Sequence, residues 1–103
     1  MENDISLEAA KKMVKESGKK FVWVGAEAHF SIAKNALEAG NDEIMCINPR
    51  QLLSIEDPKK LEGAVFVCYH GNTSGAVVNY LNKAKVQSYN LKGGITSIVG
   101  EIF

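Results

Sequence analysis

The first forty residues contain two stretches in which apolar side chains recur every three to four positions, the spacing of one helix face. The first stretch follows a candidate N-cap at Ser6 and stops at Gly18. Its apolar stripe consists of Leu7, Ala10, Met13 and Val14. The second stretch stops at Gly40, and its stripe consists of Ala26, Phe30, Ala33 and Leu37. The pattern therefore predicts one helix between Ser6 and Gly18 and another from Glu27 to Ala39.

Short, continuous apolar runs predict buried strands between the helices. The first three runs are Phe21–Val24, Ile44–Ile47 and Ala64–Cys68, and a last strand is expected near Ser88 to Leu91. Three of these strands stop at residues that disfavour strand continuation: Gly25, then Asn48-Pro49, and at the end Lys92-Gly93-Gly94. The run that ends at Cys68 continues directly into a turn-rich segment, residues 69–73.

The remaining segments complete an alternating pattern. A helical turn is expected around Arg50 to Ser54, a surface loop at residues 56–58 and a closing helix after Gly94. Another helix is predicted from about Ser74, with its buried face formed by Ala76, Val77, Tyr80, Leu81 and Ala84.

Strands that alternate with helices predict an α/β fold with a central parallel β-sheet and helices on both faces. In such folds, ligands bind beyond the carboxyl ends of the strands. Cys68 is the last residue of the clearest buried strand, so the prediction places its thiol where this class of fold performs chemistry.

The composition is that of an ordinary globular protein. The chain has 103 residues, 46% of them apolar and 23% charged, which predicts one domain over residues 1–103. Twelve acidic residues balance twelve basic ones, so we expect no nucleic-acid partner. No apolar run approaches the roughly 18 residues of a membrane span, and the start Met1-Glu2-Asn3-Asp4 does not resemble a secretory signal. A cytoplasmic protein without membrane contact is therefore expected.

Two cysteines, Cys46 and Cys68, form neither a CxxC pair nor a disulfide framework, and the zinc ligands that would join them are missing. We expect both to be free thiols. Cys46, between Met45 and Ile47, is interpreted as a core residue, with a resolving thiol as the lesser alternative. Cys68 is interpreted as reactive, against the alternative of a buried small hydrophobe.

The segment from Cys68 to Ser74 reads as strand end, tight loop and helix start. Such a loop directs several backbone N–H groups at one centre, with the positive end of the helix dipole behind them. A free cysteine has a pKa of about 8.5, and a site of this kind lowers it, so we expect a Cys68 thiolate at neutral pH. Gly71 would supply a positive φ, and Thr73 and Ser74 would supply hydroxyl donors.

Two segments carry a family resemblance. Cys68-Tyr69-His70-Gly71-Asn72-Thr73-Ser74 resembles the active-site loop of single-domain rhodaneses, and Tyr89-Asn90-Leu91-Lys92-Gly93-Gly94-Ile95 resembles their closing Y-x-L-x-G-G signature. The stretch from Ile5 to Ala10 is similar to their opening helix. The resemblance implies a small rhodanese-like domain in which Cys68 is catalytic and the substrate is bound by Tyr69, His70, Gly71, Asn72, Thr73 and Ser74.

The resemblance also implies a two-step sulfur relay. Cys68 would take sulfane sulfur from thiosulfate, polysulfide or a protein persulfide, and pass it to cyanide, a thiol or a thioredoxin-like protein. Such covalent catalysis by an activated cysteine requires no metal and no organic cofactor.

The first half of the chain departs from the family pattern. Trp23-Val24-Gly25 stands where most rhodaneses have "D-V-R", no "G-H-I-P-G-A" turn is present, and Ile98 replaces a frequent aromatic residue. His70 is the one basic residue in the loop, which favours polysulfide or a protein persulfide over thiosulfate as donor.

Two other functions are compatible with these residues. The divergent first half allows a non-enzymatic regulatory or interaction module of the same fold. A cysteine-dependent phosphatase or arsenate reductase is disfavoured, because it needs an arginine at the sixth position after the cysteine. Ser74 occupies that position, and Arg50 is the one arginine in the chain.

The remaining aromatic, histidine and lysine residues have structural interpretations beside any functional one. His70 either orients substrate or lies exposed, and Tyr69 either lines the pocket or packs on a neighbour. Trp23 is expected in the core and His29 at the surface or in packing. Solvated surface positions are expected for Lys11, Lys12, Lys15, Lys59, Lys60 and Lys92.

Overall fold

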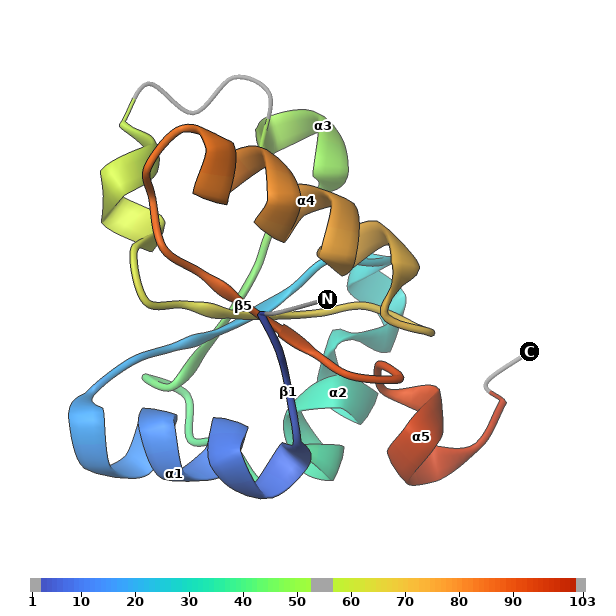
Figure 1. The fold of residues 1–103 in the computed structure, drawn as a ribbon. Helices are drawn as coiled ribbons and strands as arrows, with labels where there is room; N and C mark the ends of the chain where they lie inside the picture. Colours follow the sequence, from blue (N-terminus) through green and yellow to red (C-terminus); the bar gives the residue numbers. More distant parts are fainter. Residues whose placement is uncertain (1–2, 53–56, 102–103) are drawn as a thin grey trace.

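Five short parallel strands form one sheet in the computed structural model, which describes residues 3–52 and 57–101 (Figure 1). The strand order is β1-β5-β4-β2-β3. The strands are β1 (Asp4–Ile5), β2 (Phe21–Trp23), β3 (Ile44–Cys46), β4 (Val65–Val67) and β5 (Tyr89–Leu91). Trp23 is in register with both Cys46 and Val67, so the two cysteines lie at the same edge of the sheet. Cys46 is the last residue of β3, whereas Cys68 follows the end of β4, so the prediction that it is the last residue of its strand is wrong.

Helices cover both faces of this sheet, which confirms the predicted fold class (Figure 1). One face carries α1 (Leu7–Ser17), α2 (Phe30–Ala36) and the short α5 (Thr96–Val99), and the other carries α3 (Pro49–Leu52) and α4 (Asn72–Lys83). Two 3₁₀ helices, η1 (Glu27–His29) and η2 (Pro58–Leu61), precede α2 and β4.

The core consists of two layers, one on each side of the sheet. Because side chains alternate along a strand, Phe21, Trp23, Val65 and Val67 face α1 and α2, whereas Val22 and Phe66 face α4. All six of these side chains are completely buried. The continuous apolar runs therefore arise because both faces of the parallel sheet are covered.

Helix α1 has the boundaries that its sequence predicts. The Ser6 hydroxyl accepts a hydrogen bond from the backbone N–H of Ala9 at 3.2 Å, as an N-cap does. Gly18 ends the helix in the left-handed conformation with φ of 68°. The stripe that was predicted to face inward does so, with Ala10 and Val14 buried.

Several predicted boundaries are wrong. Only Phe30–Ala36 of the second predicted helix is α-helical, and the segment before it is the 3₁₀ helix η1. The surface loop expected at residues 56–58 has Pro58 as the first residue of η2, and its residue 56 lies outside the described residues. Residues 53 and 54 of the turn predicted near Arg50 also lie outside them, while α3 ends at Leu52.

Helix α4 differs from its prediction in start and in rotation. It begins at Asn72, two residues before the predicted start at Ser74. Its buried residues are Ser74, Gly75, Val78 and Leu81. Of the predicted inward face, Leu81 is therefore confirmed, and the exposed Ala76, Tyr80 and Ala84 are wrong. Tyr80 is 59% exposed. The cause is that Ser74 is fixed inward by the contacts described below.

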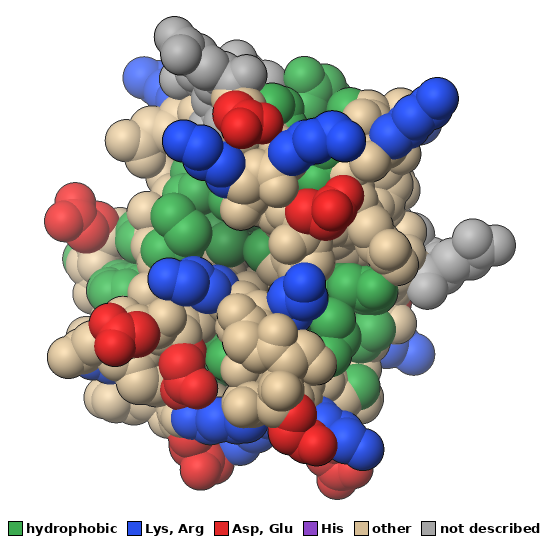
Figure 2. Space-filling model, turned by 90° about the vertical axis from the view of Figure 1, so that its left-hand side faces the viewer, with side chains coloured by type: hydrophobic (Ala, Val, Ile, Leu, Met, Phe, Trp, Pro, Cys, Tyr) green, Lys and Arg blue, Asp and Glu red, His purple; other side chains and the backbone are tan. Residues whose placement is uncertain are grey.

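Charged side chains are distributed without a single-sign patch on the face that Figure 2 presents, where blue and red groups are interspersed. Lys11 and Lys15 of α1 form ion pairs with Glu38 at 2.7 Å and Glu43 at 2.5 Å. These hydrogen bonds lower the pKa of both carboxyl groups. Within the described part of the chain, no helix is long and apolar enough to cross a membrane.

Candidate active site at the end of β4

The sulfur of Cys68 lies in a cradle of three hydrogen-bond donors. Its Sγ accepts from the backbone N–H of Gly71 at 3.1 Å, from the backbone N–H of Ser74 at 3.3 Å and from the Ser74 hydroxyl at 3.1 Å. The residue is only 3% exposed. Three donors in a buried site stabilise a negative charge on sulfur, and this is the arrangement that the loop sequence predicts.

The same sulfur serves as the N-cap acceptor of α4. Gly71 is the N-cap residue, has no side chain and adopts φ of 91°, the positive value expected of it. The N–H of Ser74 in the first turn of the helix would otherwise lack an acceptor. Because Cys68 Sγ provides one, the partial positive charge of the helix N-terminus points at the thiol.

The second segment that carries the family resemblance, around Gly93-Gly94, lies directly against this loop. The N–H groups of Ile95 and Thr96 donate to the carbonyl oxygens of Cys68 and Tyr69 at 2.8 and 2.9 Å. A side chain at Gly94 would place its Cβ 2.6 Å from the Cys68 carbonyl oxygen. The glycine is therefore required for the close approach that fixes the loop backbone.

Tyr69 packs away from the sulfur and ties its loop to the loop after β2. Its ring stands edge-on to Trp23, with centroids 5.0 Å apart, and its hydroxyl accepts from the N–H of Ala26 at 3.0 Å. His29 Nδ1 lies 2.7 Å from the same hydroxyl. Where most rhodaneses are expected to have an Asp and an Arg, this chain thus has an aromatic contact. Trp23 is fully buried, as predicted.

His70 lies on the outer side of the loop and is exposed. Its Nε2 lies 3.0 and 3.2 Å from the two carboxylate oxygens of Glu101. The one basic side chain of the loop is thus paired with an acid, which reduces its attraction for anions near the loop.

Asn72 and Thr73 contribute exposed side chains, so of the two predicted hydroxyl donors only Ser74 reaches the sulfur. Among the described residues, no cluster of three His, Cys, Asp or Glu side chains could hold a metal ion.

Asn90 is a site residue that sequence reasoning missed. It lies on β5, is 3% exposed and forms a hydrogen bond with the Ser74 hydroxyl. Its Nδ2 donates to Asp4 Oδ1 at 2.9 Å and to the Gly71 carbonyl oxygen at 3.2 Å. The available signal was a polar residue between Tyr89 and Leu91 in a strand that was predicted to be buried. A buried amide must find hydrogen-bond partners, so Asn90 could have been expected to contact other polar groups.

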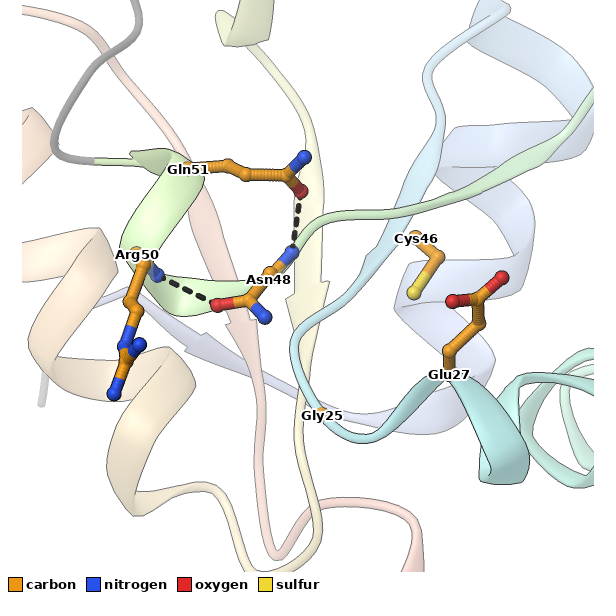
Figure 3. A pocket seen from close by; sticks show the side chains of 6 residues that line it. All are labelled: Gly25, Glu27, Cys46, Asn48, Arg50 and Gln51. Atoms are coloured by element: carbon orange, nitrogen blue, oxygen red, sulfur yellow. Dashed lines mark hydrogen bonds between the residues drawn. The ribbon is translucent and has the colours of Figure 1, made fainter.

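Cys46 is only in part the core residue that was predicted, because it packs against the core but is not fully buried. It is half-buried and lines an open cavity of about 420 Å³ together with Gly25, Glu27, Asn48, Arg50 and Gln51. Figure 3 shows its sulfur on the side of Glu27, while the Arg50 side chain extends away from it. Burial, and then the negative charge of Glu27, raise the pKa of the Cys46 thiol. The reason for its exposure is that β3 is the edge strand of the sheet.

No protein-family model matches the sequence. No curated protein matches it either. Solved structures do match over nearly the whole chain. A rhodanese-related protein from Thermoplasma volcanium is 21% identical, with 98% of this chain and 94% of that chain covered and a TM-score of 0.63. A rhodanese-like domain protein from Staphylococcus aureus is 23% identical, with 97% and 93% covered and a TM-score of 0.65.

A further match, to a chain from Bacillus anthracis, has a TM-score of 0.68 at 12% identity and covers 17% of that larger chain. With identities below 25%, the structural agreement in these matches establishes the fold alone. The chain therefore has the rhodanese-like fold that its two sequence motifs predicted.

Proposed function

We propose that this protein is a sulfurtransferase that carries sulfane sulfur as a persulfide on Cys68. The observation that supports this most directly is the set of three donors on a sulfur at a strand end. The same groups would stabilise the attacking thiolate and the departing thiolate, which is what covalent catalysis by cysteine requires. The rhodanese-like fold of the similar structures supports the same chemistry.

In the first step, the Cys68 thiolate attacks the sulfane sulfur of the donor. A new S–S bond forms at Sγ, and the S–S bond inside the donor breaks. The electron pair of that bond leaves with the remainder of the donor, as sulfite from thiosulfate or as a shortened polysulfide. The negative charge is then on the outer sulfur of the persulfide.

In the second step, a nucleophilic acceptor attacks the outer sulfur, and Cys68 leaves as the thiolate. The acceptor can be cyanide, a small thiol or a thioredoxin-like protein. No external oxidant or reductant is needed, because the S–S bond at Cys68 breaks as the outer sulfur forms a bond to the sulfur of a thiol acceptor or to the carbon of cyanide. Cys68 returns to its starting state after each cycle.

We propose polysulfide or a protein persulfide as the preferred donor, ahead of thiosulfate. Cys68 is only 3% exposed, so the donor must present its sulfur end-on. A polysulfide chain is slender, whereas thiosulfate has a bulky, negatively charged sulfonate group whose binding normally requires a positively charged side chain. The loop's one basic residue, His70, is paired with Glu101.

Intact-mass spectrometry after incubation with each donor tests the proposal. We expect a mass gain of one sulfur atom that dithiothreitol removes. The Cys68→Ser variant should show no gain, and the matched Cys46→Ser variant should load like the wild type. Faster loading from thiosulfate than from polysulfide would contradict the donor preference. A folded wild-type protein that no donor loads would instead favour a non-enzymatic binding module.

A further inference from the structure

A chain of buried polar groups leads from Cys68 to the first strand. Ser74 connects the sulfur to the Asn90 side chain, and Asn90 connects Ser74 to Asp4 of β1. The orientation of the Asn90 amide is determined by its neighbours. Its NH₂ group faces two acceptors, the Asp4 carboxylate and the Gly71 carbonyl, so its oxygen must face the Ser74 hydroxyl.

The Ser74 hydroxyl has one proton and two acceptors within reach. One acceptor is Cys68 Sγ at 3.1 Å, and the other is Asn90 Oδ1. A hydroxyl cannot donate fully to both at once. The two groups therefore compete for the proton, and the outcome depends on the charge of the sulfur.

Each charge state of Cys68 has its own arrangement of protons. As a thiol, Cys68 can donate S–H to the Ser74 oxygen, and Ser74 then donates to Asn90, so every group is satisfied. As a thiolate, Cys68 draws the hydroxyl proton, and the buried Asn90 oxygen loses its donor. An unsatisfied buried acceptor is unfavourable, so Asn90 opposes ionisation of the thiol.

We propose that Asn90 is a positioning residue that controls the charge of Cys68 through the Ser74 hydroxyl proton. This inference rests on the proposed function for its biological meaning, because the thiolate is the attacking species. In the persulfide the charge is on the outer sulfur, so the hydroxyl can return to Asn90. The residue thereby favours the loaded form over the free thiolate.

The other charged groups near the loop are held elsewhere. Asp4 contacts the amide of Asn90 and not the sulfur, and His70 and Glu101 pair on the outer side of the loop. The Tyr69 hydroxyl contacts His29 and Ala26, away from the sulfur, and Lys92 after β5 is exposed.

The test is a pH titration of the thiolate ultraviolet absorbance, which needs no sulfur donor. The Cys46→Ala background leaves Cys68 as the single cysteine. We expect Asn90→Leu to move the ionisation midpoint about one pH unit lower, because leucine has no oxygen to compete for the proton. Ser74→Ala should move it about one unit higher, because the thiolate loses a donor.

The double variant separates positioning from general damage. Without the Ser74 hydroxyl, Asn90→Leu should leave the midpoint within about 0.3 units of Ser74→Ala alone. Equal shifts in both backgrounds, or none in the single variant, would overturn the proposal. Gly71 keeps its carbonyl bond from the Gly75 N–H, so the loop retains an anchor in Asn90→Leu.

Two further variants keep the test decisive. Asn90→Val also removes the acceptor and suits a strand, and it replaces Asn90→Leu if leucine prevents folding. Asn82→Leu removes a half-buried amide at the far end of α4, where its oxygen accepts from the Ser88 N–H. It should lower stability and leave the midpoint unchanged. If the titrations give the expected shifts but no donor loads sulfur onto Cys68, the sulfurtransferase function is rejected and the role of Asn90 is retained.

Discussion

Cys46 and Cys68 lie at the same edge of the sheet but on opposite faces of it, and their surroundings differ. Both lie at the carboxyl ends of parallel strands on either side of β2. Cys68 is buried and receives three hydrogen bonds, whereas Cys46 is half-buried and has Glu27 beside it. The comparison shows that a position at a strand end does not by itself surround a thiol with hydrogen-bond donors. The residues that follow the strand decide it.

The difference begins in the backbone. After Cys68, Gly71 turns the chain with a positive φ and α4 starts at once, so its N–H groups converge on the sulfur. After Cys46, the chain continues through Ile47 and Asn48 before α3, and the Asn48 side chain accepts the N–H of Arg50. The first loop offers its donors to the cysteine, and the second uses a donor within itself.

Gly94→Ala should have the largest effect on the difference between the two cysteines, because it damages the loop after Cys68 and leaves the loop after Cys46 intact. The added Cβ would lie 2.5 Å from the Tyr69 carbonyl oxygen at a φ of 65°. We expect a loss of about 3 kcal/mol or more in the free energy of unfolding, measured by urea denaturation. Gly18→Ala is the matched control, since its φ of 68° is similar and no atom lies within 4 Å. An equal loss in both variants would mean that the close approach does not matter.

Tyr69→Phe should weaken the link between the Cys68 loop and the loop after β2. It removes the hydroxyl that accepts from Ala26 and contacts His29, and it retains the ring against Trp23. We expect a loss of about 1 kcal/mol in the same measurement. Tyr80→Phe, on an exposed side chain, should stay within about 0.5 kcal/mol of the wild type. A neutral Tyr69→Phe would indicate that this hydroxyl does not anchor the loop.

Glu27→Gln should bring Cys46 closer to Cys68 in reactivity. The negative charge of Glu27 disfavours the Cys46 thiolate, so its removal lowers the raised pKa of Cys46. Burial, the larger cause, remains, and the pKa should stay above its ordinary value. We expect alkylation of Cys46 at mildly alkaline pH to be about 3-fold faster in a Cys68→Ser background. Glu8→Gln on α1 is the control, and an unchanged rate in Glu27→Gln would show that Glu27 has no such effect.

Glu101→Gln should have the smallest effect, a slightly faster reaction of Cys68 with an anionic sulfur donor. Without the carboxylate, His70 no longer has an acidic partner at the mouth of the loop. We expect sulfur loading from thiosulfate to be about 2-fold faster at low salt and the gain to vanish at high salt. Glu16→Gln on α1 should leave the rate unchanged. A slower rate in Glu101→Gln would mean that the carboxylate assists the site.

The sequence predicted well those features that depend on near neighbours. The caps of α1, the buried run of β4 and the positive φ of Gly71 each follow from local chemistry. The place of Cys68 at a strand end followed from the alternation of strands and helices. Within this loop, local backbone geometry also brings the donors to the sulfur.

The features that were missed depend on distant parts of the chain. Strand β1 has two residues and no periodic pattern, and it exists because it pairs with β5. The rotation of α4 was wrong because apolarity favoured Tyr80, whereas the contacts of Ser74 with Cys68 and Asn90 set the inward face. The exposure of Cys46 depends on β3 being an edge strand, which the strand order alone reveals.

The hydrogen bond between Asp4 and Asn90 has a consequence for how the protein is made. It joins residues 86 positions apart, so the two ends of the sequence must meet before the polar chain behind Cys68 is complete. Contacts of such long range form late when a chain folds. During synthesis on the ribosome, β5 emerges after the other four strands. We therefore expect the control of the Cys68 charge by Asn90 to be established late in folding, after β1 has paired with β5.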